Sequence, residues 1–142
     1  MRLLVLGGTV FLSKTLVKQA LERGHEVTVL ARGNGSVPRG ANLHRADRDQ
    51  GRAAFDGLDG EWDAVIDVGR IPEHVKAAAA ALAGRVRQWC FVSTVSVYAT
   101  QSRLGDDESA ELLPALAEGE DPATHYGEAK IACEQILVEQ VE

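Results

Sequence analysis

The 142-residue chain has few cysteines, no excess of basic residues and no long apolar run. Its apolar runs are too short to span a bilayer, and its N-terminus enters a predicted strand rather than a signal peptide. The net charge of −6 argues against a nucleic-acid partner, because such a partner requires a basic face. We therefore expect a cytoplasmic protein with neither a membrane nor a nucleic-acid partner.

The two cysteines, Cys90 and Cys133, lie far apart and form no CxxC pair. Each lies in an apolar stretch, so we expect two buried thiols in a reducing compartment and no disulfide. The four histidines lack the spacing of metal ligands, so the sequence indicates no metal site.

Strands and helices are predicted to alternate along the chain. Short apolar or β-branched runs predict strands at residues 2–6, 25–30, 42–45, 63–67 and 88–92. Helical spacing, with flanking glycine or proline, predicts helices at 11–23, 49–55, 73–83 and 124–138. The apolar face of the first helix is expected to comprise Phe11, Leu12, Leu16, Val17, Ala20 and Leu21. This alternation predicts an α/β fold with a doubly wound parallel sheet of order 3-2-1-4-5 and a ligand at the carboxyl ends of strands 1 and 4.

Two stretches outside these elements also carry predictions. Trp62, just before the fourth strand, is expected in the core. The acidic stretch 104–121 is expected to be irregular, with a short helical turn near Leu112. It is either a solvated loop or the border of a substrate entrance.

The first strand turns into the first helix at Gly7-Gly8-Thr9. Glycines at such a turn let the backbone approach a pyrophosphate, and the helix N-terminus presents free N–H groups and partial positive charge to it. No Gly-Lys-Ser/Thr follows, so the turn is not a Walker loop. The sequence here predicts a dinucleotide site.

Two further patterns carry hydroxyl and amine groups. Tyr126 and Lys130 are four residues apart on the last predicted helix and share one face. A lysine beside a phenol lowers the phenol pKa, and such a tyrosine can exchange a proton with a substrate hydroxyl. A pair of ordinary surface residues is the alternative.

The second pattern is residues 93–98, with the sequence STVSVY, which follow the fifth strand. Their hydroxyl groups either face the ligand crevice or cap the next segment.

Taken together, GGTVFL, VSTVSVY and HYGEAKIACEQIL resemble the extended branch of the short-chain dehydrogenase/reductase superfamily, the NAD(P)-dependent epimerases, dehydratases and reductases. HEVTVLARG resembles the subgroup whose glycine loop reads GGTxFxG. The resemblance covers residues 1–142 and implies a Rossmann-type NAD(P)-binding domain. The chain ends after the YxxxK helix, where the C-terminal substrate-binding part of the family would follow.

The resemblance implies roles for individual residues. Tyr126 matches the catalytic acid/base, Lys130 the lysine that lowers its pKa and holds the nicotinamide ribose, and Thr94 the catalytic hydroxyl. Asp47 matches an adenine contact, with a helix N-cap as the equal alternative. The cofactor-binding set is Gly7, Thr9, Phe11, Leu12, Arg32, Asp47, Val68, Gly69 and Lys130. Arg70 either contacts phosphate or reaches solvent.

Cofactor choice depends on the end of the second strand. An acid there would bind the ribose hydroxyls of NAD, but the sequence has Ala31-Arg32, and a guanidinium suits a 2′-phosphate. The sequence therefore favours NADP over NAD. Val10 and Ser13 stand where the family has glycines, and Ser13→Gly is expected to tighten NADP binding by letting the helix pack closer.

The functional hypothesis is an NADP-dependent reductase, epimerase or dehydratase acting on a hydroxyl or ketone of a small molecule, such as a nucleotide-linked sugar. One alternative is a regulator or sensor that binds NADP without turnover. Another is an inactive fragment that binds nothing. The resemblance also suggests a homodimer through the fourth and last helices. The substrate is not specified by the sequence.

Overall fold

Five parallel strands form one sheet in the order β3-β2-β1-β4-β5, as the sequence predicts. They are β1 (Arg2–Leu6), β2 (Glu26–Ala31), β3 (Asn42–Arg45), β4 (Ala64–Asp67) and β5 (Trp89–Phe91). The computed structural model describes residues 1–7, 9, 11–33, 35–100, 102 and 104–141, without the side chain of residue 141. In β1, Leu6 pairs with Leu30 on one side and Asp67 on the other, so β1 and β4 end level and β2 continues one residue further.

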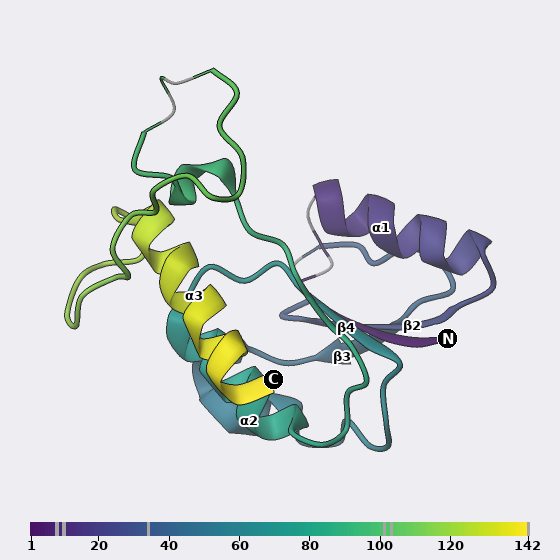
Figure 1. The fold of residues 1–142 in the computed structure, drawn as a ribbon. Helices are drawn as coiled ribbons and strands as arrows, with labels where there is room; N and C mark the ends of the chain where they lie inside the picture. The colour runs from purple at the N-terminus through teal and green to yellow at the C-terminus, as the bar shows by residue number, and fades with distance from the viewer. Residues whose placement is uncertain (8, 10, 34, 101, 103, 142) are drawn as a thin grey trace.

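The helices cover the two faces of the sheet unequally. α1 (Phe11–Glu22) lies on one face, whereas α2 (Pro72–Leu82) and α3 (Tyr126–Val141) lie side by side on the other (Figure 1). The 3₁₀ helix η1 (Arg48–Phe55) packs on the α2 face, and the short η2 (Val95–Val97) follows β5. Pro72 occupies the first turn of α2, where its missing N–H costs no hydrogen bond.

Alternate residues of β1 supply two apolar layers, because successive side chains of a strand point to opposite faces. Leu3 and Val5 pack with α1 residues, whereas Leu4 and Leu6 pack with η1 and α2. Trp62 is 1% exposed in the second layer, which confirms its predicted place in the core.

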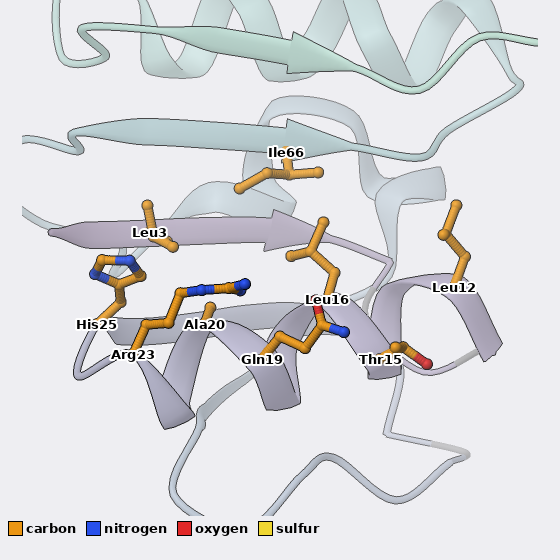
Figure 2. Close-up of a pocket in the computed structure, with 9 residues that line it drawn as sticks. All are labelled: Leu3, Leu12, Thr15, Leu16, Gln19, Ala20, Arg23, His25 and Ile66. Atoms are coloured by element: carbon orange, nitrogen blue, oxygen red, sulfur yellow. The ribbon is translucent and has the colours of Figure 1, made fainter.

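Several predictions about burial and local structure are wrong. Phe11 and Leu12 are 87% and 52% exposed, because the first turn of α1 extends past the carboxyl edge of the sheet, as Figure 2 shows for Leu12. Cys90 is exposed, since its neighbours Trp89 and Phe91 pack with α2 and α3, while α1 packs over β1, β2 and β4. Cys133 is buried, as predicted.

Two expected helical segments also differ from the prediction. Residues 48–55 form two 3₁₀ turns joined at Gly51, whose backbone is non-helical (φ 61°, ψ −131°). Near Leu112 there is an antiparallel bridge to Tyr98 in place of a helical turn. Hydrogen bonds from Ala99 N to Glu111 O and from Leu113 N to Val97 O, both 2.8 Å, fold the acidic stretch back onto η2.

Candidate active site

The carboxyl edge of the sheet brings together the segments that the sequence identifies as functional. Gly7 follows β1, Arg32 follows β2, Asp47 comes two residues after β3, Val68 follows β4 and Thr94 comes shortly after β5. Parallel strands end on one edge of a sheet, and ligands of such folds bind there, where the strand order reverses. In this sheet the reversal lies between β1 and β4.

The β1–α1 turn is shaped by Gly7. Its φ is +97°, and a Cβ there would lie 3.0 Å from Val68 Cγ2, so a side chain would be both strained and crowded. The Gly7 N–H donates to Leu30 O at 3.0 Å, and the Thr9 N–H donates back to Gly7 O at 3.0 Å. Gly8 and Val10 lie outside the described residues. The bare backbone at Gly7 fits the close approach of a pyrophosphate.

Ser13 has a role that the sequence did not predict. Its side chain is fully buried, and its hydroxyl donates to Gly7 O at 2.9 Å. The serine therefore connects the first turn of α1 to the glycine turn by a hydrogen bond. Thr9 precedes this helix and the exposed Phe11 and Leu12 lie in its first turn, and the N-terminus of a helix favours an anion.

The end of β2 carries two exposed cations. Arg32 follows Ala31, and Ala31 pairs with Arg45 at the end of β3. The Arg45 guanidinium lies over Gly33, where a Cβ would come within 2.8 Å of its Nε. Arg32 is predicted from the sequence and Arg45 is not, because only the strand register brings the two strand ends together.

Asp47 is the N-cap of η1. Its carboxylate accepts the Asp49 N–H at 3.1 Å, which confirms the capping alternative. Its adenine contact stays a prediction. Arg70, after β4, is exposed.

The end of β4 contains a buried ion pair. The Asp67 side chain is fully buried and accepts two hydrogen bonds from the Arg48 guanidinium, at 2.8 and 2.9 Å. It also accepts the Gly69 N–H at 2.7 Å. Neither Arg48 nor Asp67 has a role predicted from the sequence. The one available signal was an acid ending the apolar run DAVID.

Lys130 is 2% exposed and joins α3 to the ends of two strands. Its ammonium donates to Gly69 O at 2.8 Å and to Val92 O, and it lies 3.8 Å from the centre of the Phe91 ring. Burial lowers the pKa of Lys130, while nearby Cys133, Asp67 and Glu134 act in the opposite direction. Among the described residues, no hydrogen bond connects this ammonium to Tyr126.

Thr94 and Tyr126 lie on neighbouring elements. Thr94 caps η2 by accepting the Ser96 N–H at 3.2 Å. Gly127 brings α3 against η2 so closely that a Cβ would overlap the Ser96 carbonyl oxygen. Tyr126, the adjacent residue, is 39% exposed at the start of α3. The close contact at Gly127 thus sets how far the phenol lies from the end of β5.

A pocket of about 360 Å³ opens beside Thr94. Glu134, one turn after Lys130, lines it and accepts a hydrogen bond from the Ser93 hydroxyl. Glu134 is not among the residues predicted from the sequence, although it continues the four-residue spacing of Tyr126 and Lys130. The other lining residues are Val95, Val97, Tyr98, Glu108 and Leu112.

A second pocket, of about 390 Å³, lies on the α1 face of the sheet (Figure 2). Its floor is apolar, with Leu3, Leu16 and Ile66, and its rim carries Arg23 and His25. None of the predicted catalytic residues lines it.

Comparison with known proteins identifies the family. A model of the NAD-dependent epimerase/dehydratase family matches residues 3–142. This chain belongs to that family. No curated protein matches its sequence. Among the described residues, no helix has both the length and the apolar character of a membrane span.

Solved structures similar to this fold include epimerases and a reductase. A UDP-galactose 4-epimerase superposes with a TM-score of 0.77 at 22% identity, over 98% of this chain and 51% of the other. The Bordetella bronchiseptica enzyme WbmG, in complex with NAD and UDP, gives 0.74 at 20% identity, over 97% and 49%. Vestitone reductase from alfalfa (Medicago sativa) gives 0.64 at 20%, over 97% and 51%. This family member therefore spans about half the length of these structures.

Proposed function

We propose that this chain is the nucleotide-binding part of an NAD(P)-dependent enzyme that oxidises or reduces a carbinol or ketone. A nucleotide-linked sugar is the proposed substrate class. The observation that carries the proposal is Lys130, whose buried ammonium lies at the ends of β4 and β5, one turn after Tyr126 on α3. The name of the family and the UDP bound to WbmG support the cofactor and the substrate class.

In the proposed reaction, each residue acts on the substrate oxygen or on the cofactor ribose. The Tyr126 phenol takes the proton of the carbinol oxygen, and the Thr94 hydroxyl donates a hydrogen bond to that oxygen. The Lys130 ammonium has three N–H donors and uses two of them for the carbonyls of Gly69 and Val92. Its third N–H donates to the nicotinamide ribose. A bound nicotinamide supplies the hydride acceptor or donor. In the reverse direction Tyr126 returns the proton to the forming alcohol.

NADP is the proposed cofactor, with NAD as the alternative. Arg32 and Arg45 are two exposed guanidiniums at the ends of β2 and β3, where the ribose 2′-position of a dinucleotide lies. No acid occupies the end of β2. Guanidinium groups favour phosphate through bidentate hydrogen bonds.

The first test is thermal unfolding with NADP and with NAD. A ligand that binds only the folded state raises its stability, so we expect a larger rise in Tm with NADP at equal concentration. Arg32→Glu should reverse the order, because a carboxylate repels the 2′-phosphate and accepts the ribose hydroxyls. A larger rise with NAD for the unmodified chain would overturn the cofactor assignment.

The second test concerns turnover. In a protein that carries a substrate-binding part, Tyr126→Phe removes the proton carrier, and we expect kcat to fall by about 10²- to 10⁴-fold. Unchanged turnover would show that Tyr126 is not the acid/base. Nicotinamide absorbance reports the hydride transfer directly.

A binding protein without turnover is the second candidate. It is favoured by the hydrogen bonds of Lys130, which join its ammonium to two backbone carbonyls and not to the Tyr126 phenol. This candidate predicts that NADP raises the Tm while no hydride transfer occurs with any hydroxyl or ketone substrate.

A further inference from the structure

Arg48 is a buried cation at the start of η1, with its side chain 11% exposed. Its guanidinium meets the fully buried Asp67 carboxylate through two hydrogen bonds. The Nε of Arg48 has no hydrogen-bond partner among the described residues. Asp67 therefore holds this guanidinium in place. Removing either partner would leave the other as an unpaired buried charge, which destabilises the fold.

The turn after β4 wraps around this ion pair. Gly69 donates its N–H to Asp67 Oδ1 at 2.7 Å. A Cβ on Gly69 would lie 2.8 Å from Asp67 Oδ1 and 2.9 Å from Arg48 Nη1, so the backbone itself rests on the paired groups. The carbonyl of the same residue accepts the Lys130 ammonium at 2.8 Å. One peptide segment thus connects the ion pair to Lys130.

We propose that Arg48 and Asp67 are positioning residues, which set the place of the Lys130 ammonium through the backbone of Gly69. This inference rests on the proposed function, in which Lys130 holds the nicotinamide ribose. Arg48 touches neither the ribose nor the substrate in this scheme. It acts by keeping the Gly69 carbonyl where Lys130 meets it.

Charge gives the ion pair a second effect on Lys130. The Asp67 carboxylate is close enough to favour the protonated amine of Lys130. With Arg48 in place, that carboxylate is neutralised by a guanidinium. Without Arg48 it becomes an unpaired buried anion, which is costly. Loss of Arg48 would therefore loosen the Gly69 turn, whose N–H and carbonyl bond to Asp67 and Lys130.

The test is a double-mutant cycle on dinucleotide binding. Arg48→Met, Lys130→Met and the double variant are titrated with NADP and, in parallel, NAD. The adenosine halves, 2′,5′-ADP and ADP, are titrated as well. We expect Arg48→Met to weaken dinucleotide binding about tenfold, the loss of one charged hydrogen bond, while the adenosine halves change less than about twofold. The double variant should bind no more weakly than Lys130→Met, because one residue acts through the other.

Two outcomes of the cycle would overturn the inference. Additive losses in the double variant would mean that Arg48 contributes independently of Lys130. Equal losses for the adenosine half would mean that Arg48 contacts the cofactor directly or supports the whole site. A merely structural role weakens both ligands alike, so the comparison separates positioning from general stability.

A labelling experiment needs no nucleotide. Reductive methylation followed by mass spectrometry reports the exposure of Lys130, with the exposed Lys76 as the internal reference. We expect Lys130 to be protected in the unmodified chain and labelled at least about tenfold faster in Arg48→Met and Asp67→Asn, because its protection rests on the hydrogen bond to Gly69.

Arg85→Met is the matched control for the labelling. Arg85 is a partly buried arginine that bonds to Leu58 O before β5, at the amino edge of the sheet, and its loss should leave Lys130 protected. Unchanged labelling in Arg48→Met would refute the inference. If the unmodified chain bound no dinucleotide, the proposed function would fail and the labelling alone would decide the positioning role.

Discussion

Replacing Ser13 tests how α1 is attached to the glycine turn. The serine is fully buried and its hydroxyl donates to Gly7 O, which also accepts the Thr9 N–H. Ser13→Ala removes the hydrogen bond and keeps a Cβ, whereas Ser13→Gly removes the side chain entirely. The two variants therefore separate the hydrogen bond from the helix propensity of the residue.

The structure gives the expected magnitudes. The lost hydrogen bond to Gly7 O should cost about 1 kcal/mol, because Gly7 O keeps its bond to Thr9. In a helix interior, alanine is more favourable than serine by about 0.5 kcal/mol, and glycine less favourable by a similar amount. The free energy of unfolding should thus fall by about 0.5 kcal/mol in Ser13→Ala and about 1.5 kcal/mol in Ser13→Gly. The latter corresponds to a fall in Tm of about 5 °C.

Urea denaturation followed by circular dichroism measures both values. The exposed Gln19 of the same helix provides the control, since Gln19→Ala and Gln19→Gly differ by propensity alone. If Ser13→Ala were more stable than the unmodified chain by the full propensity gain, the hydrogen bond would contribute nothing.

The Ser13 hydrogen bond also bears on cofactor binding. The sequence predicts that Ser13→Gly tightens NADP binding. In the structure, however, the Ser13 hydroxyl donates to the Gly7 carbonyl and so stabilises the glycine turn, which would face the pyrophosphate. We therefore reverse that expectation and expect binding no tighter than in the unmodified chain. Tighter binding would show that α1 can still move closer to β1.

Two further predictions concern α3. Gly127→Ala should lower the free energy of unfolding by about 2 kcal/mol in chemical denaturation, because the new Cβ would overlap the Ser96 carbonyl oxygen; unchanged stability would contradict the close contact. Burial raises the pKa of the Cys133 thiol from 9.0 to about 12, so the folded state keeps a proton that the unfolded state releases. Stability should therefore fall between about pH 9 and pH 12, by up to about 1.4 kcal/mol per pH unit. Lys130, whose pKa is lowered by burial, contributes the opposite slope below about pH 10.5. Cys133→Ala should lose the falling slope, and an unchanged pH profile would refute the assignment.

Much of the fold was predictable because its signals are local. Four of the five strands are short, mostly apolar runs, whereas β3 has the weaker pattern NLHR. The predicted strand bounds lie within one residue of those observed. The last helix begins at Tyr126 rather than residue 124 and ends three residues later than predicted. Helix ends depend on contacts with other elements, which local spacing does not contain.

Burial was less predictable than secondary structure. Phe11 and Leu12 belong to the predicted apolar face and Cys90 to an apolar run, yet all three are exposed because nothing among the described residues covers them. Polarity specifies what a side chain prefers, whereas burial also requires a neighbouring element at that place.

The sequence by itself determined the alternation of strands and helices, the order of the sheet and the family to which the chain belongs. These properties follow from hydrophobic periodicity, glycine at the turns and motifs that are contiguous in the chain. Only the tertiary structure decided which groups meet at the carboxyl edge. Arg48, Asp67 and Lys130 come from three separate elements. Their contact depends on right-handed crossovers that bring η1, β4 and α3 together. The distances between these three elements are set by the packing of the fold and cannot be read from local sequence patterns.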